Sequence, residues 1–244
     1  MFVPTAECVT IGKAIKAEIS HLWHPPSNYY HLRAGGHVAG LKDHMPNSVF
    51  VHLDIKNFFN SISKTRVTRV LKSLVGYEKA RQWANFSTVS HTTNGVKASI
   101  LPFGFVQSPI VASLCLYKSA LGAALASLDS KGVKVSVYMD DIVLSADDSA
   151  ILLSIVEDLK RLAVISGFNL NPTKEEGPAE QITAFNILLK NESVAVTPER
   201  WDNFAVALAN AKSEHERRGI LGYVRTVSEA QAVDLETQLP LGQS

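Results

Sequence analysis

The chain is poor in cysteine and has no long apolar segment. Its two cysteines, Cys8 and Cys115, are far apart in the sequence and predict neither a disulfide framework nor a zinc site. No run of about 18 apolar residues is present, so no membrane-spanning helix is indicated. The first residues also lack the basic start and apolar block of a secretion signal. We therefore expect a cytoplasmic protein with reduced thiols and no membrane partner.

The chain also lacks an excess of charge of either sign. Its 244 residues contain 24 Lys and Arg against 23 Asp and Glu, and 46% of them are hydrophobic. This composition supports a globular core but does not by itself indicate a nucleic-acid-binding protein. Basic residues are concentrated in residues 56–81, where the only acidic residue is Glu78. Such a segment could neutralise the phosphates of a bound nucleic acid, or it could be a solvated helix face.

Two adjacent carboxylates, Asp140 and Asp141, lie at the turn of a predicted β-hairpin. The apolar segments 133–138 and 142–146 predict its two strands. Adjacent carboxylates repel each other, so this pair does not favour folding. Carboxylate oxygens are, however, the ligands that hard divalent cations prefer. The pair therefore predicts a site where a divalent cation meets a phosphate.

Two further segments precede this hairpin. The predicted strand 48–54 is apolar and ends in Asp54, which is followed by the aromatic pair Phe58 and Phe59. A charge at the end of a buried strand is unfavourable unless an opposite charge meets it. The segment 101–109 predicts a turn with Gly and Pro that leads into an apolar helix. An acid-ended strand, a turn with a helix, and an acidic hairpin follow one another in the order of a polymerase palm.

On these residues the chain resembles the reverse transcriptases. Their motifs A, B and C are similar to residues 54–59, 101–109 and 138–141. Residues 167–174 are similar to motif D, and residues 181–188 are similar to the primer-grip hairpin of motif E. Residues 31–37 are similar to the glycine-rich segment before motif A, and residues 219–225 to the short thumb. Several motifs in the right order are more specific than any one of them. The resemblance covers residues 30–235, and it is nearest to bacterial retron, group II intron and phage-defence enzymes.

The resemblance implies nucleotidyl transfer with two Mg²⁺ ions, for which Mn²⁺ can substitute. Asp54 and Asp140 are the expected bridging ligands, Asp141 is a supporting carboxylate, and the carbonyl of Ile55 adds a ligand. Lys174 is expected to give a proton to the leaving pyrophosphate or to offset its charge. A lysine that follows Asn-Pro is also typical of an ordinary loop.

The same resemblance places other side chains near the substrates. Phe59 is expected to stand against the 2′ position of the incoming sugar and to exclude a ribonucleotide, while one of the two neighbouring rings belongs to the core. Reverse transcriptases carry Gln where this chain has Phe103, and Gln107 is the expected substitute. The expected nucleotide-binding residues are Phe58, Phe59, Phe103, Gly104 and Gln107. The expected nucleic-acid-binding residues are Arg33, Lys64, Arg66, Arg69 and Lys72.

These features predict an α+β fold, a polymerase palm in which an antiparallel sheet packs on helices, with abbreviated fingers and a short helical thumb. The expected parts are fingers at 1–47, a palm at 48–197 with an inserted finger-side helix at 63–100, and a helical thumb at 198–244. Helices are expected at 11–22, 63–85, 109–127 and 149–166, and a final helical region from Pro198. Asp147 or Asp148 is expected to cap the helix from 149. A second hairpin is expected from strands 184–189 and 193–196.

We expect an RNA-directed DNA polymerase that uses dNTPs to copy a dedicated, structured noncoding RNA into DNA, in antiphage defence. Three alternatives remain: retron-type synthesis of RNA-linked DNA, an RNA-directed RNA polymerase, and a catalytically retired palm that acts as an assembly subunit. Phe59 argues against the RNA polymerase. The set of Asp54, Asp140 and Asp141 argues against a retired palm, which has no physical need for three mutually repelling acids. The short fingers favour a site completed by a protein partner, a second copy of the chain or the RNA.

Overall fold

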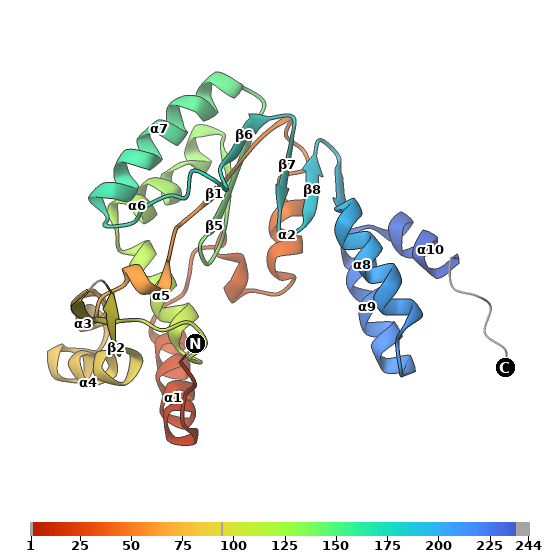
Figure 1. Ribbon diagram of the computed structural model, residues 1–244. Helices are drawn as coiled ribbons and strands as arrows, with labels where there is room; N and C mark the ends of the chain where they lie inside the picture. The colour runs from red at the N-terminus through yellow and green to blue at the C-terminus, as the bar shows by residue number, and fades with distance from the viewer. Residues whose placement is uncertain (1, 94, 238–244) are drawn as a thin grey trace.

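A four-stranded antiparallel sheet brings the acidic segments of the sequence together (Figure 1). The structure is a computed structural model that describes residues 2–93 and 95–237. In spatial order the strands are β4 (Lys134–Tyr138), β5 (Asp141–Ala146), β1 (Val49–Asp54) and β6 (Glu176–Ala179). The predicted strand 48–54 and the predicted hairpin between 133 and 146 are confirmed. The short edge strand β6 was not predicted.

Strand β1 is buried on both faces, because its side chains alternate between two hydrophobic cores. Val51 and Leu53 pack in the larger core, which collects helices from the first two-thirds of the chain. Phe50 packs in the smaller core, together with Val143 of β5 and residues of the C-terminal segments. The central sheet therefore joins two differently built parts, and its end is held from both sides.

Three helices, α5 (Ser108–Tyr117), α6 (Ala120–Ser127) and α7 (Ser149–Ile165), contribute to the larger core. The prediction of one helix over 109–127 is wrong, since α5 and α6 are bent by 77° from each other. Ser119 caps the new helix by accepting a hydrogen bond from the Gly122 amide at 3.1 Å. Among the described helices none alone is long and apolar enough to cross a membrane; the bent pair α5–α6 meets that length and composition together.

Helices α1 and α7 each begin after a residue whose side chain caps the helix, and the sequence predicted only one of these caps. Helix α1 (Ala6–Leu22) begins earlier than the predicted residue 11, because the Thr5 hydroxyl accepts a hydrogen bond from the Cys8 amide. Helix α7 is capped by Asp148, which accepts from the Ala150 amide at 2.8 Å. Its neighbour Asp147 accepts from the Ser48 amide instead. The expected cap is thus confirmed for Asp148.

The segment between β1 and α5 holds more elements than the sequence predicted. They are α3 (Lys64–Val75), α4 (Tyr77–Ser87), and the hairpin of β2 (Val89–Thr93) and β3 (Val96–Ile100). The predictions of one helix at 63–85 and of an inserted helix reaching 100 are wrong. Gly76 separates α3 from α4 with a φ of 79°, a value that favours glycine. The β-branched residues that follow α4 favour strands over a longer helix.

The C-terminal part holds a small sheet and three helices. Its strands are β7 (Gln181–Ala184), β8 (Ile187–Lys190) and β9 (Ser193–Val196). The prediction of one strand at 184–189 is wrong, because Phe185 and Asn186 form a turn with φ of 58° and 60°. The predicted hairpin from β8 to β9 is confirmed.

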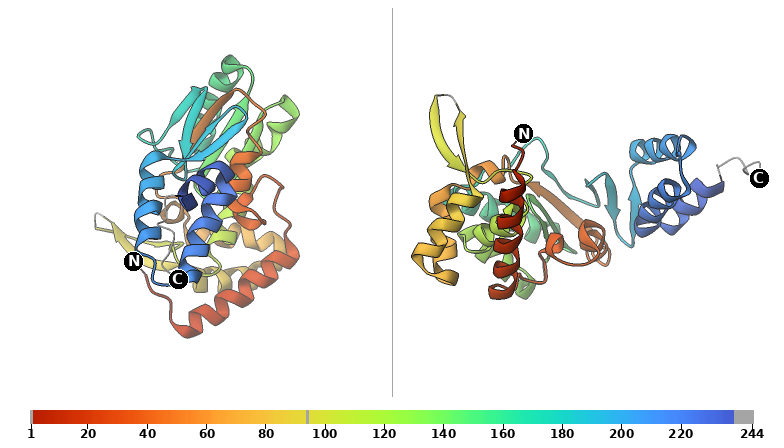
Figure 2. Two further views of the ribbon diagram at one scale, coloured as in Figure 1. Left: turned by 90° about the vertical axis from the view of Figure 1, so that its right-hand side faces the viewer. Right: turned by 90° about the horizontal axis from the view of Figure 1, so that it is seen from below.

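The remaining helices are α2 (Gly36–Lys42), α8 (Pro198–Ala209), α9 (Glu214–Val227) and α10 (Glu229–Thr237). Helix α2 packs in the smaller core beside the C-terminal strands. Helices α8–α10 stand on one side of the central sheet, and α1, α3 and α4 stand on the other (Figures 1 and 2). The end of the sheet that holds the acidic residues therefore lies between two groups of helices.

Candidate active site

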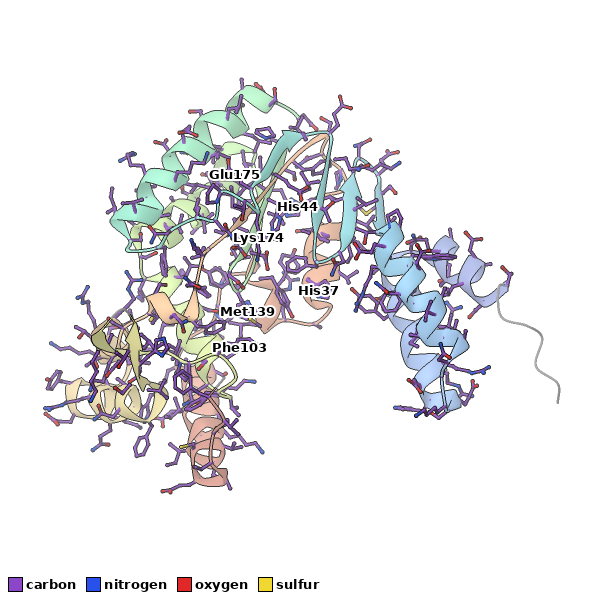
Figure 3. The ribbon with its side chains drawn as sticks, viewed as in Figure 1. His37, His44, Phe103, Met139, Lys174 and Glu175 are labelled. Atoms are coloured by element: carbon purple, nitrogen blue, oxygen red, sulfur yellow. The ribbon has the colours of Figure 1, made fainter. Side chains whose placement is uncertain are left out.

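Three aspartates lie near one another at one end of the central sheet. The register of β1 and β5 sets Asp54 directly opposite Asp141. Asp140 lies in the turn between β4 and β5, and its carbonyl accepts a hydrogen bond from the Ile55 amide at 2.9 Å. Met139 makes this turn tight with a φ of 58°. Figure 3 shows Met139 below Lys174 at the centre of the molecule, between the two groups of helices.

Asp54 is buried, with 3% of its surface exposed, and its partner is a lysine. The Lys174 ammonium donates a hydrogen bond to Asp54 Oδ2 at 2.8 Å. This contact raises the pKa of Lys174, with smaller effects from the charges of Asp141 and Asp140. The ion pair compensates the charge that the buried strand end would otherwise leave unmatched.

The loop before Lys174 is tied to the end of β1 by main-chain hydrogen bonds. The Lys56 amide donates to the Asn169 carbonyl, and the Asn171 amide donates to the Asp54 carbonyl, both at 2.8 Å. Leu170 forms an isolated bridge with Ile55 between them. The segment predicted as motif D therefore lies beside the predicted motif A, and this placement explains how Lys174 reaches Asp54.

A histidine that the sequence analysis missed holds the third carboxylate. His52 Nε2 lies 2.8 Å from Asp141 Oδ1, and His52 itself is buried. The two-residue period of a strand places His52 and Asp54 on the same face of β1. That alternation was the available signal, because a histidine two residues before a catalytic-type aspartate shares its face. We infer that His52 orients the Asp141 carboxylate.

The three carboxylates give this end of the sheet excess negative charge. Burial, followed by the charges of Asp141 and then Asp54, raises the pKa of Asp140 to about 6, while Lys174 opposes this shift. Across the described residues, no three acidic, histidine or cysteine side chains converge as they would in a preformed metal site. Asp54 instead pairs with Lys174, and Asp141 pairs with His52. The oxygen donors and their mutual repulsion fit a hard divalent cation that displaces these partners.

Replacing Asp140 with Asn is expected to stabilise the metal-free protein at neutral pH. A carboxyl whose pKa rises on folding, here from 3.8 to about 6, binds its proton more tightly when folded, so stability falls as pH rises through this range. Removing the charge should raise the free energy of unfolding by about 1 kcal/mol after solvent screening. This corresponds to a Tm higher by ~2–4 °C. Thermal melting near pH 7 and near pH 4 checks both size and sign. Exposed Asp129→Asn is the control, and a variant Tm below that of the parent at neutral pH contradicts the account.

The two neighbouring phenylalanines after β1 have different places. Phe58 is fully within the larger core and packs against Phe168 at 5.7 Å between ring centroids. The expectation that Phe58 binds a nucleotide is therefore corrected, because no face of its ring is free. Phe59 is half-buried, and its ring meets the edge of Phe103 at 5.6 Å. Phe103 is 61% exposed, at a turn where Gly104 has a φ of 94°.

Gln107 does not stand in for the missing motif B glutamine. Its side chain is 1% exposed and lies under α1, where its Nε2 donates to the Phe86 carbonyl and the Ser87 hydroxyl at 3.4 and 3.3 Å. A β-carbon added to Gly12 of α1 would lie 2.3 Å from Gln107 Oε1. The expectation of a nucleotide contact is corrected, because this side chain is enclosed by the packing of α1 and α4.

Three of the expected nucleic-acid-binding residues, Lys64, Arg69 and Lys72, line one groove between α3 and α4. Arg66 points elsewhere. Its guanidinium donates to the Ser166 carbonyl and lies 4.5 Å over the Phe168 ring. The expectation that Arg66 contacts nucleic acid is corrected, since it links α3 to the end of α7.

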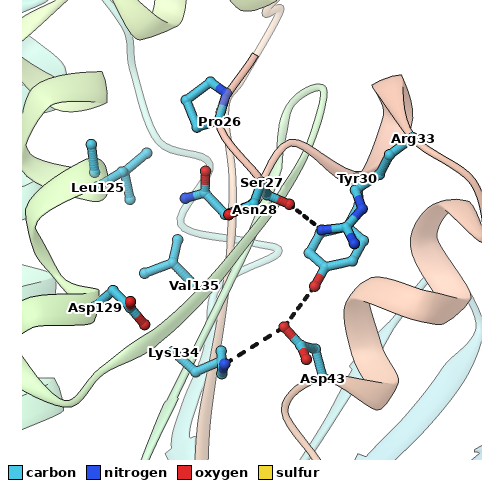
Figure 4. A pocket seen from close by; sticks show the side chains of 11 residues that line it. Pro26, Ser27, Asn28, Tyr30, Arg33, Asp43, Leu125, Asp129, Lys134 and Val135 are labelled. Atoms are coloured by element: carbon cyan, nitrogen blue, oxygen red, sulfur yellow. Dashed lines mark hydrogen bonds and ion pairs between the residues drawn. The ribbon is translucent and has the colours of Figure 1, made fainter. Parts of the chain in front are cut away.

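Arg33 lies in a separate pocket of about 260 Å³ (Figure 4). It donates to the Ser27 carbonyl, and its guanidinium lies 4.7 Å over the Tyr30 ring. Tyr30 donates to Asp43 Oδ2 at 2.6 Å, and Lys134 pairs with the same carboxylate at 3.7 Å. Nucleic-acid binding by Arg33 stays a prediction, since Arg33 is exposed; its guanidinium also fixes the segment that precedes α2.

An aromatic cluster joins the acidic hairpin to the C-terminal helices. The ring of His37, from α2, lies 5.5 Å from Tyr138 and 5.0 Å from Phe185, and these two rings are 5.3 Å apart. His37 Nε2 also hydrogen-bonds the Tyr223 hydroxyl of α9 at 3.2 Å. The glycines of segment 31–37 are visible in the sequence, whereas this role of its histidine follows only from tertiary packing. The cluster fixes Tyr138 beside the carboxylates.

Comparisons with known proteins match the chain to one family model, described as reverse transcriptase (RNA-dependent DNA polymerase), over residues 2–188. Solved structures with a similar fold include a foamy viral protease-reverse transcriptase in complex with an RNA/DNA hybrid, at a TM-score of 0.51 and 16% identity, covering 90% of this chain and 26% of that chain. A second foamy viral structure, in complex with double-stranded DNA, is similar at a TM-score of 0.50 and 19% identity. The match covers 84% of this chain and 33% of that chain.

Telomerase from Candida albicans, in complex with a TWJ fragment of telomeric RNA, is also similar, at a TM-score of 0.59 and 10% identity, covering 94% of this chain and 48% of that chain. At such identities the likeness concerns the fold alone. The chain spans between about a quarter and a half of the length of these chains. The predicted α+β fold, a polymerase palm in which antiparallel sheet packs on helices, is confirmed.

Proposed function

Because this chain belongs to the reverse transcriptase family, we propose that it is an RNA-directed DNA polymerase that copies RNA into DNA from dNTPs. The observation that carries the proposal is the pairing of Asp54 with Asp141 beside Asp140 at the end of one sheet. Three carboxylates there require positive counter-charge, which divalent metal ions supply while they also bind the triphosphate of a nucleotide. The similar solved proteins are in complex with an RNA/DNA hybrid, DNA and telomeric RNA, which supports nucleic-acid partners.

The residues at the sheet end are suited to hold two Mg²⁺ ions, or Mn²⁺ in their place. Asp54, Asp140 and Asp141, with the Ile55 carbonyl, would hold them. Divalent ions there would supply positive charge that lowers the pKa of an attacking 3′-hydroxyl and neutralises the leaving pyrophosphate. His52 keeps the Asp141 carboxylate oriented through its 2.8 Å hydrogen bond.

Lys174 supplies a positive charge beside these acids. Its ammonium lies 2.8 Å from Asp54 Oδ2, so it is within reach of groups that bind at that carboxylate. Its raised pKa keeps it protonated at neutral pH. From this position Lys174 Nζ offsets the charge of the leaving pyrophosphate or gives a proton to its oxygen. The proton then returns from water.

Phe59 is the proposed determinant of sugar selection, so Phe59→Ala is expected to relax it. The half-buried ring occupies space beside Phe103, five residues after Asp54, and a smaller side chain leaves room for a 2′-hydroxyl. We expect the use of ribonucleotides relative to deoxyribonucleotides to rise at least about tenfold. Ratios of kcat/KM for each NTP and its dNTP measure this selectivity.

The control for this variant is Phe86→Ala, which removes an exposed ring from α4. It should leave the ratio unchanged. If Phe59→Ala remains active with the parental ratio, the ring does not select the sugar, and Phe59 is then only a packing residue.

We propose that the template is a dedicated, structured noncoding RNA and that the setting is antiphage defence. The resemblance of the ordered motifs to small bacterial enzymes of this kind supports both statements. We also propose fingers at 1–47, a palm at 48–197 and a thumb at 198–244, of which residues 238–244 lie outside the described residues.

Purification of the protein with its bound RNA tests the template directly. The preparation is given Mg²⁺ with labelled dNTPs or NTPs, and the products are digested with DNase or RNase and sequenced. DNA copied from one recurrent RNA is the expected result. RNA product points to an RNA polymerase, and DNA copied from unrelated RNAs contradicts the dedicated template. DNA joined to an RNA 2′-hydroxyl identifies retron-type priming.

A further inference from the structure

A groove between α3 and α4 is lined by four basic side chains, one tyrosine and the neutral polar residues Thr65, Thr68 and Asn85. Lys64, Arg69 and Lys72 come from α3, and Tyr77 and Arg81 come from α4. The groove has a volume of about 510 Å³, and none of the described side chains that line it is acidic. This local charge contrasts with the net charge of +1 for the whole chain.

The four cations of the groove make no ion pair or side-chain hydrogen bond with any residue that the structure describes. Other exposed cations do find partners. Lys79, on the same helix, pairs with Glu18, and Arg218 and Arg225 of α9 pair with glutamates one turn away. Like charges that share a groove repel each other, so this surface is stabilised when an anion binds there.

The groove faces away from the hydrophobic core. Val67, Val70 and Leu71 of α3 and Trp83 of α4 are buried on other faces of these helices. Arg66 reaches in a different direction, to the end of α7. Figure 1 shows α3 and α4 at the edge of the molecule opposite α8–α10, away from the sheet end with the three carboxylates. The groove is therefore a surface separate from the proposed catalytic centre.

We propose that this groove binds a single-stranded segment of RNA. Its cations would contact successive phosphates, and the ring of Tyr77, which is 49% exposed, would stack on a base. A positively charged groove with an accessible aromatic ring is the combination that single-strand-binding proteins use. An acidic peptide could match the charge but gives the ring no flat partner. The binding of single-stranded RNA does not depend on the proposed function. Only the identification of that RNA as a template strand rests on it.

The length of the groove suits several nucleotides. Lys64 and Lys72 are eight positions apart on α3, which corresponds to about 12 Å along the helix. Phosphates follow one another at about 3.4 Å per strand in a stacked nucleic acid. Arg81 lies across the groove on α4, so the two helices can contact the strand from both sides.

Fluorescence anisotropy with a labelled single-stranded RNA of about 12 nucleotides tests the proposal without any need for polymerisation. The double variant Lys72→Glu with Arg81→Glu should weaken binding at least about tenfold and lower the magnitude of the salt slope by about 1.4, since each phosphate contact contributes about 0.7. Tyr77→Ala should weaken binding about tenfold, whereas Tyr77→Phe, which keeps the ring, should bind as the parent does.

The matched control is Lys131→Glu with Arg161→Glu, which changes the net charge equally at exposed residues outside the groove. It should bind within about twofold of the parent, because distant surface charges are screened. No measurable binding by the parent, or equal weakening by both double variants, overturns the proposal. A protein that binds through the groove but does not polymerise would refute the proposed function alone.

Two sources of the strand are separated with primer–template complexes that carry a long or a short unpaired template end. Groove variants that lose affinity only for the long end assign the groove to the template that is still to be copied. Groove variants that lose affinity for the free oligonucleotide but not for the long end assign it to another segment of the RNA. The proposal is overturned if the groove variants bind the free oligonucleotide, the long-ended complex and the short-ended complex as tightly as the parent does.

Discussion

Replacing Asp54 with Asn is expected to lower the rate of nucleotide addition by roughly a thousandfold, which corresponds to ~4 kcal/mol of transition-state stabilisation. Asp54 is the most buried of the three acids, and it directly faces Asp141 in the sheet. Asn keeps the shape and an oxygen that can accept from Lys174, but it removes the charge that holds a cation. Single-turnover extension of a primer on an RNA template measures the loss.

The control for this variant is Asp129→Asn, an exposed aspartate outside the sheet. It should retain the parental rate, and circular dichroism of both variants should match the parent. Activity of Asp54→Asn within tenfold of the parent would show that Asp54 is not a metal ligand. The ion pair with Lys174 would then be a structural contact that stabilises the end of β1.

Replacing Phe168 with Ala is expected to destabilise the protein by about 3–5 kcal/mol, the usual range for removing a fully enclosed phenylalanine. The ring lies between the guanidinium of Arg66, at 4.5 Å, and the ring of Phe58, at 5.7 Å. Its loss leaves a cavity where three segments meet: the end of α7, the start of α3 and the chain after Asp54. Urea unfolding followed by circular dichroism gives the free energy of unfolding.

Phe103→Ala is the matched control, because this phenylalanine is mostly exposed and its truncation should change stability by less than about 0.5 kcal/mol. Equal stability of Phe168→Ala and the parent would contradict the packing described for this ring. A large loss that also lowers the activity of the folded enzyme is compatible with it, since Phe168 begins the loop that positions Lys174.

The sequence predicts the acidic centre well because its signals are local. An apolar strand that ends in Asp54 and a hairpin that turns at Asp140 and Asp141 are each visible in a few residues. The order of motifs then gives the fold, and the family is confirmed. His52 was within reach of the same reasoning, since strand alternation places it on the face of Asp54.

Other features depend on packing between distant segments, which a local pattern does not contain. Gln107 could be taken for a nucleotide contact until α1 covers it, with Gly12 against its amide. Arg66 belongs to a basic run by sequence but reaches the end of α7 through tertiary contacts. The choice between Phe58 and Phe59 as the core residue is likewise decided by the turn of the chain after β1.

Helix breaks were missed for a related reason. Gly76 permits a continuous helix or a break, and the φ of 79° is selected when α4 packs back along α3. The bend between α5 and α6 brings Gly122 against the Leu116 carbonyl, where no side chain fits. The local sequence pattern favoured one helix in both places, and tertiary packing overrode it.

The measurement that tests the central claim most directly is DNA synthesis on a defined RNA template with a DNA primer and dNTPs. The parent is compared with the double variant Asp140→Asn and Asp141→Asn, both shown to be folded by circular dichroism. The account predicts extension by the parent, dependent on Mg²⁺ or Mn²⁺, and none by the double variant. Equal extension by the two proteins would contradict the assignment of these carboxylates as the catalytic centre.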